Sequence, residues 1–228
     1  MTSALFRYPK SRHIRQFQPR AFRRYQTYKR WLQRDFSRVC VYCRESDCWS
    51  PNLNFGVDHY KPKSISSFRH LACQYSNLYY CCSNCNSRKN NFWPPDENVG
   101  PYVVNPCDHV MADHLRFDAK TGRIEHRSPW GEHMIELLQL NEAASVQMRK
   151  NTLLLARTCE DEIKHHEKEL YALSRRLQRG EVPRGDYDLQ ANNIQGQLAE
   201  LQSALDSLTG ATALPPLRKT RMSISVHP

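Results

Sequence analysis

The sequence predicts an α+β protein in which a small cysteine-rich core lies between a basic N-terminal arm and a C-terminal antiparallel α-helical hairpin. Three observations predict this order: an acid-free N-terminal stretch, two Cys-x-x-Cys pairs, and a late run without Gly or Pro whose apolar residues recur at heptad spacing. We divide the chain into an arm (1–35), a core (36–105), a loop and hairpin extension (106–150), a helical hairpin (151–209) and a flexible basic tail (210–228).

The composition excludes several classes of protein. With 228 residues the chain can bury a sizeable core. It contains no run of about 18 apolar residues, so no membrane span or membrane partner is expected. The basic N-terminus is interrupted by Pro9 and Pro19 and lacks the apolar stretch of a secretory signal. We therefore expect a cytoplasmic protein.

The excess positive charge lies in the arm. Residues 1–34 contain ten Lys or Arg and no acid, whereas the rest of the chain carries 23 bases and 23 acids. Aromatic residues alternate with these bases, a mixture suited to phosphates and stacked bases. We expect Arg23, Arg24 and Arg30 to bind nucleic acid. The alternative is a helix over about residues 21–36 that packs its aromatic side chains on the core, which would still leave long basic side chains free to reach phosphates.

The middle of the chain predicts short elements. Pro94, Pro95, Gly100, Pro101 and Pro106 make a long helix through this region improbable. Residues 114–117 and 123–126 flank Lys-Thr-Gly122, which predicts a short hairpin with glycine at a positive φ.

Two helices are predicted near the C-terminus. The first covers residues 151–179, residues 180–185 interrupt the pattern, and Asp186 is expected to cap a second helix that reaches Leu208. At ~1.5 Å per residue they would be about 43 and 33 Å long and lie antiparallel. The hairpin could merely support the domain, or it could bind a partner chain or a second copy of this chain.

The two Cys-x-x-Cys pairs are Cys40 with Cys43 and Cys82 with Cys85. Four thiolates satisfy tetrahedral Zn²⁺ and leave no open position, so the zinc would be structural. Cys81 has the wrong spacing to Cys85 for the usual chelating turn.

Between and beside these pairs lie Val57-Asp58-His59-Tyr60-Lys61-Pro62, then Asn77, then Cys85-Asn86-Ser87-Arg88-Lys89. Together these motifs resemble the HNH nuclease family, in its zinc-clasped branch with an Asp-His pair and an Asn directly after the last cysteine. The resemblance covers about residues 40–89. It implies a ββα-metal nuclease core, in which two antiparallel strands lie over a helix.

The resemblance also implies roles for individual residues. His59 would be the general base, Asp58 and Asn86 would hold one catalytic Mg²⁺ or Mn²⁺, and Asn77 would fix the loop that aims His59. Many members have a histidine where this chain has Asn86, and an amide oxygen favours a hard cation. Basic residues near the motifs are expected to meet phosphates of the nucleic acid: Lys61, Lys63, Arg88 and Lys89.

Elementary chemistry agrees with these roles. A neutral imidazole is available near pH 7 to take a proton from water, and a cation can offset charge on the leaving oxygen. Adjacent residues on an extended strand point to opposite faces. We therefore expect a bend or bulge that brings Asp58 and His59 to one site.

A narrower resemblance concerns Asn105-Pro106-Cys107-Asp108-His109 and residues 57–64, which are similar to HNH subunits of Septu-type anti-phage systems. That likeness implies an ATPase partner. We expect an endonuclease that hydrolyses phosphodiester bonds, with DNA favoured over RNA, as the effector subunit of a defence complex. The alternative is a non-catalytic zinc-dependent subunit that binds nucleic acid or acts as a scaffold.

Overall fold

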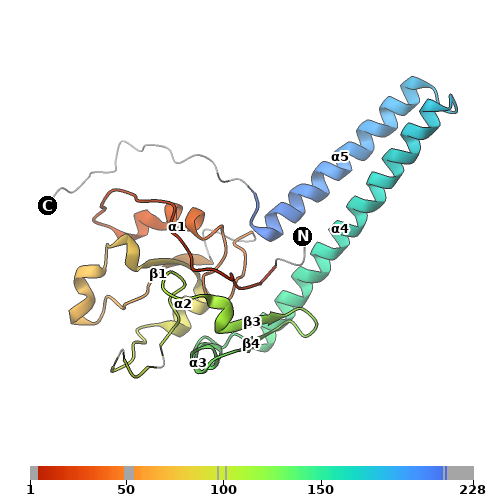
Figure 1. The fold of residues 1–228 in the computed structure, drawn as a ribbon. Helices are drawn as coiled ribbons and strands as arrows, with labels where there is room; N and C mark the ends of the chain where they lie inside the picture. The colour runs from red at the N-terminus through yellow and green to blue at the C-terminus, as the bar shows by residue number, and fades with distance from the viewer. Residues whose placement is uncertain (1–4, 49–53, 97, 101, 213, 215–228) are drawn as a thin grey trace. The chain divides into compact units, whose positions relative to one another are not determined.

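A computed structural model describes residues 5–48, 54–96, 98–100, 102–212 and 214. Most of the tail expected from residue 210 onward, namely 213 and 215–228, lies outside the described residues. The described residues fall into two compact units, one of residues 6–150 with residue 214 and one of residues 151–212 with residue 5 (Figure 1).

The N-terminal arm is part of the hydrophobic core of the first unit. A 3-10 helix, η2 (Tyr25–Tyr28), leads into α1 (Lys29–Asp35), so the expected helix over 21–36 begins later than predicted. Tyr8, Phe22, Tyr28 and Leu32 are buried in the core cluster. The packing role considered for the aromatic side chains of the arm is confirmed.

Arg15 holds the arm against the following segments. Its guanidinium lies over the rings of Tyr75 and Tyr79, at 4.9 and 4.7 Å from their centroids. It donates a hydrogen bond to the carbonyl of Leu78 at 2.7 Å. Cation–π contacts of this kind stabilise by about 0.5–2 kcal/mol, so this basic residue serves packing.

Two antiparallel strands and a helix form the centre of the first unit. β1 (Phe55–His59) pairs with β2 (Leu78–Cys82) in a continuous register from Phe55 opposite Cys82 to His59 opposite Leu78. The connection contains the 3-10 helices η3 (Ser66–Leu71) and η4 (Tyr75–Asn77). Every residue of β2 is buried, as its sequence Leu-Tyr-Tyr-Cys-Cys favours. Helix α2 (Ser83–Lys89) follows β2 directly.

The segment after the core forms a second small sheet. The 3-10 helix η5 (Met111–Asp113) precedes β3 (Leu115–Asp118), which pairs antiparallel with β4 (Arg123–His126). The hairpin predicted here is confirmed, and Gly122 has a φ of +73° at its turn. Helix α3 (Pro129–Leu137), which lies within the predicted loop and hairpin extension and was not predicted as a helix, follows with Ser128 as its N-cap.

A buried arginine ties the start of α4 (Ala143–Gln178) to this hairpin. Arg149 donates hydrogen bonds to the carbonyls of Gly122 and Leu140, each at 2.7 Å. The Arg149 side chain therefore holds both the turn of the β3–β4 hairpin, at Gly122, and the connection between α3 and α4, at Leu140.

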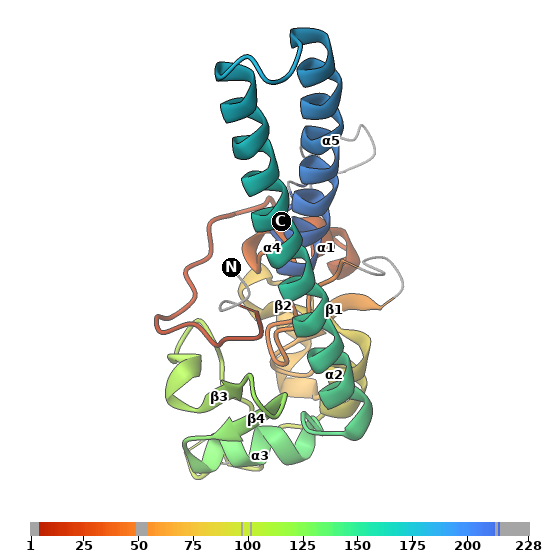
Figure 2. The ribbon, with the colours of Figure 1, turned by 90° about the vertical axis from the view of Figure 1, so that its right-hand side faces the viewer.

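The second unit is the helical hairpin made by α4 from residue 151 and by α5 (Arg184–Thr209), which run side by side in both ribbon views (Figures 1 and 2). The predicted hairpin is confirmed. Helix α4 begins at Ala143, eight residues before the predicted start. The N-cap of α5 is Pro183, and Asp186 lies in the first turn of the helix. The prediction that Asp186 caps this helix was therefore wrong.

The facing sides of the two helices are only partly covered. Leu173 and Ala191 are buried, whereas Ile194 and Leu198 are half-buried. A groove of about 550 Å³ lies between the helices. Over the described residues, no helix is both long and apolar enough to cross a bilayer.

Candidate metal centre and active site

The four predicted zinc ligands come together in the first unit. The Sγ atoms of Cys40, Cys43, Cys82 and Cys85 all lie within 4.8 Å of one another, and all four residues are buried. Cys43 and Cys82 approach to 3.6 Å. The first pair lies on the loop after α1, and the second spans the end of β2 and the first turn of α2.

This cluster fits a tetrahedral metal ion. A Zn–S distance of about 2.3 Å requires sulfur atoms about 3.8 Å apart, close to the 3.6 Å between Cys43 and Cys82 and within the 4.8 Å limit of the whole cluster. Cys82 is also the N-cap of α2, and its Sγ accepts a hydrogen bond from the Cys85 backbone N–H at 3.5 Å. The cluster could therefore hold zinc that joins the loop, the strand and the helix. Cys81 lies close by, with its Sγ 4.0 Å from that of Cys40.

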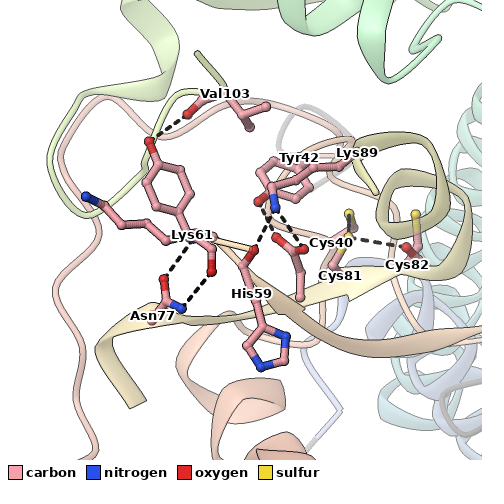
Figure 3. A network of polar contacts seen from close by, with 11 residues as sticks. Cys40, Tyr42, His59, Lys61, Asn77, Cys81, Cys82, Lys89 and Val103 are labelled. Atoms are coloured by element: carbon pink, nitrogen blue, oxygen red, sulfur yellow. Dashed lines mark hydrogen bonds and ion pairs between the residues drawn. The ribbon is translucent and has the colours of Figure 1, made fainter. Parts of the chain in front are cut away.

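Asp58, the predicted ligand of the catalytic cation, belongs to a buried polar network with Tyr42 and Lys89, two residues that Figure 3 labels. One carboxylate oxygen accepts a hydrogen bond from the Tyr42 hydroxyl at 2.6 Å. The other lies 3.1 Å from the Lys89 ammonium, which also donates to the carbonyl of His59 at 2.7 Å. Asp58 is 2% exposed and Lys89 is 1% exposed.

Tyr42 acts as a donor in this network. Burial and the charge of Asp58 raise the pKa of its hydroxyl well above the usual value. The phenol therefore stays protonated and keeps its hydrogen bond to the carboxylate. Asp58 thus has one neutral and one cationic partner inside the protein.

His59, the predicted general base, is 8% exposed and has a fixed ring. Its Nε2 lies 3.0 Å from the carbonyl of Ala72, and its ring meets that of Tyr25 edge-on at 4.5 Å. A carbonyl oxygen can only accept, so Nε2 carries the proton and Nδ1 carries the lone pair of the neutral ring. Burial, opposed by the Ala72 carbonyl, lowers the pKa of His59, with Lys63 lowering it further.

The expected bulge between Asp58 and His59 is absent, because β1 pairs with β2 without interruption through His59. The two side chains consequently lie on opposite faces of the strand. Asp58 meets Lys89 of α2, whereas the imidazole of His59 points away from the Lys89 amine (Figure 3). The prediction of a distorted strand was wrong. The strand stays regular because Lys89 and Tyr42 satisfy the Asp58 carboxylate where a regular strand places it.

Asn77 fixes the chain immediately after His59. Its Oδ1 accepts from the Lys61 backbone N–H at 2.8 Å, and its Nδ2 donates to the Lys61 carbonyl at 3.0 Å. The backbone of Tyr60 also donates to the carbonyl of Asn77 at 2.9 Å. Asn77 therefore holds the backbone two residues beyond His59.

Asn86 lies on the helix face that carries the buried residues of α2. Cys82, Cys85 and Lys89 are buried, and Asn86 is half-buried at the position three residues before Lys89. Positions three and four apart share one side of a helix. Asn86 therefore lies on the side of α2 from which Lys89 reaches Asp58.

The basic residues expected to bind nucleic acid differ from one another in their exposure and in their contacts. Arg23, Arg24 and Lys63 are exposed, and the Lys63 ammonium lies 4.0 Å from the centre of the Tyr25 ring. Lys61 lies 5.0 Å from each of the Phe68 and Trp93 rings, and Arg30 lies 4.2 Å from the Trp31 ring.

Arg88 pairs with Glu142 and donates to the carbonyl of Leu138. Lys89 faces Asp58 inside the protein.

Two partners of Asp58 were not recognised from the sequence. Tyr42 lies between the first two cysteines, and nothing in that short motif indicates what its hydroxyl faces. A signal did exist for Lys89, because it follows Cys85 by four residues and Cys82 by seven, which is the spacing of one helix face.

No family model matches the chain, and no solved structure matches it. The chain is similar to the Septu protein PtuA of Bacillus mycoides (strain KBAB4), at 23% identity over 145 residues. The match covers 53% of this chain and 20% of that protein, so the chain spans about a fifth of the length of this relative.

Proposed function

We propose that this protein is a metal-dependent endonuclease in which His59 is the general base and Asp58 and Asn86 bind the catalytic cation. The observation that carries the proposal is the succession of β1, β2 and α2 beside the four-cysteine cluster. This succession puts an immobilised neutral imidazole at the end of one strand and a carboxylate next to it.

The fixed tautomer of His59 supports its role. With Nε2–H bound to the Ala72 carbonyl, Nδ1 is the atom that would accept a proton from the attacking water. Asn77 holds the backbone that follows. Both contacts limit the movement of the base, which favours a productive orientation.

The donors near Asp58 fit a hard cation by chemical type, because a carboxylate and an amide oxygen are the ligands that Mg²⁺ and Mn²⁺ prefer. When bound, the cation would offset the charge that develops on the leaving oxygen. It would have to share the Asp58 carboxylate with Lys89 or displace the ammonium. In-line displacement puts the nucleophile and the leaving oxygen on opposite sides of phosphorus, so base and cation need not share one strand face.

A second candidate function is a non-catalytic zinc-dependent subunit that binds nucleic acid or acts as a scaffold. The burial of Asp58 favours it, because the Lys89 ammonium already neutralises this carboxylate. The edge-on contact of Tyr25 with His59 also favours it.

Incubation with plasmid DNA and with total RNA, in Mg²⁺ or in EDTA, separates the two functions. The endonuclease cuts at least one substrate in Mg²⁺, stops in EDTA, and recovers with excess Mg²⁺ but not with Zn²⁺ alone. His59→Ala should lose the activity, whereas the exposed control His126→Ala should keep it. A zinc-loaded protein that binds but never cuts either substrate favours the scaffold.

We further propose that the chain acts in an anti-phage defence complex. The similarity to a Septu protein supports this role, as does the resemblance of residues 57–64 and 105–109 to HNH subunits of such systems. The hairpin of α4 and α5 is our candidate for binding an ATPase chain or a second copy, because Tyr171 and Leu189 are 68% and 74% exposed on it. Size-exclusion chromatography with and without an ATPase of such a system tests this, and Tyr171→Asp with Leu189→Asp should abolish any complex.

A further inference from the structure

We infer that a basic pocket between the start of the arm and the β3–β4 hairpin is a second binding site, which holds the phosphodiester backbone of a nucleic acid. The inference rests on the proposed function for the identity of its ligand. None of the residues lining the pocket was a predicted binding residue, and none belongs to the network of Asp58 and His59.

The pocket is formed by segments more than a hundred residues apart. The arm passes beside β3, as Figure 2 shows. It is held there by a hydrogen bond from the Ala112 backbone N–H, just before β3, to the Pro9 carbonyl at 3.2 Å. The rings of Phe6 and Phe117 meet at 5.3 Å. The resulting pocket has a volume of about 270 Å³, far more than the roughly 30 Å³ that one water occupies.

Four cationic side chains line this space. Arg7 and Lys10 come from the arm, and Arg116 and Arg127 come from β3 and the end of the hairpin. All four residues are exposed, and none of the described residues lining the pocket is acidic. Arg116 shares its charge with Glu125 at 2.8 Å, and Arg127 donates to the Ala112 carbonyl at 3.3 Å. Glu125 offsets one of the four charges, so the pocket keeps a net positive charge, and two of its guanidinium groups are held in place.

Such a pocket suits phosphate more than bases. Guanidinium groups match phosphate oxygens with paired hydrogen bonds. The aromatic residues are engaged elsewhere, since the Tyr8 hydroxyl donates to the Tyr42 carbonyl at 2.8 Å and Phe117 packs on Phe6. Recognition of the backbone without stacking would not depend on base sequence.

The test measures DNA affinity as a function of salt, in the His59→Ala background and without added Mg²⁺, so that cleavage plays no part. Each phosphate contact on B-DNA contributes about 0.9 to the slope of log K against log salt concentration. Replacing Arg116 and Arg127 by Gln should reduce that slope by roughly two, as should Arg7→Gln with Lys10→Gln. The control, Lys120→Gln with Arg123→Gln, removes the same charge from the same hairpin outside the pocket and should leave the slope unchanged.

A slope that is equal in wild type and both pocket variants would overturn the proposal, as would an equal loss in the control. Binding of free ATP that depends on Arg116 and Arg127, with an unchanged DNA slope, would also overturn it by assigning the phosphates to a nucleotide. Circular dichroism verifies that each variant is folded. Loss of the proposed nuclease activity would leave these binding results intact.

Discussion

The ammonium of Lys89 lies 3.1 Å from the carboxylate of Asp58, and both groups are almost completely buried. Lys89 is the last residue of α2 and Asp58 is the penultimate residue of β1, so the ion pair joins the helix to the strand that ends at His59. The Lys89 ammonium also donates to the His59 carbonyl, so it contacts two consecutive residues at the end of β1.

Replacing Lys89 by Met should destabilise the protein by about 3–5 kcal/mol, because it leaves a buried carboxylate whose only remaining partner among the described residues is the Tyr42 hydroxyl. Chemical denaturation measures the change. The exposed Lys120→Met should change the free energy of unfolding by less than about 0.5 kcal/mol. Asp58→Asn combined with Lys89→Met should be less destabilised than the two single variants together, and strict additivity would mean that the pair is not coupled.

Removal of the metal from the four-cysteine cluster should unfold the first unit. Structural zinc contributes on the order of 10–16 kcal/mol in small zinc domains, which is as large as the whole stability of a typical domain. Elemental analysis should find one zinc per chain, lost in Cys85→Ser and retained in Cys107→Ser, whose thiol lies outside the cluster. A Cys85→Ser protein with full zinc and an unchanged melting temperature would refute the assignment.

Asn77→Ala should cost about 1–3 kcal/mol, because the N–H and carbonyl of Lys61 lose their partners. If Asn77 also positions His59, the cleavage rate of the folded variant should fall while its DNA affinity stays near that of wild type. Asn84→Ala, on the exposed side of α2, should change neither quantity. Wild-type cleavage by a destabilised Asn77→Ala would limit this residue to a structural role.

The pH dependence of cleavage should report the lowered pKa of His59. The base acts in its neutral form, so activity is present above its pKa and is lost as the pH falls through that value. Since the pKa lies below the usual value near 6.5, the acid limb of kcat/KM should lie below pH 6.5 at saturating Mg²⁺. An acid limb centred at pH 7 or above would be incompatible with His59 in its described environment.

Spacing along the chain was sufficient to predict the parts of this structure that depend on local geometry. The two Cys-x-x-Cys pairs meet as expected, and the heptad pattern around Leu173 and Ala191 forms the predicted hairpin. Both patterns express contacts between residues on one turn or one helix face.

Contacts between distant segments could not be obtained in this way. The partners of Asp58 come from the loop before β1 and from the end of α2, and a strand pattern carries no information about either. The bulge was wrongly expected because Lys89 meets the Asp58 carboxylate on a regular strand, and a strand pattern does not reveal that contact. Likewise, the charge count of the arm did not indicate that Arg15 would pack on Tyr75 and Tyr79.

The assignment of His59 as the general base is tested by the rate of phosphodiester cleavage by His59→Ala, relative to wild type at saturating Mg²⁺. A general base contributes about 10²–10⁴-fold, so the folded, zinc-loaded variant should be slower by at least about 100-fold. Cleavage by this variant at the wild-type rate would contradict the assignment of His59 as the base.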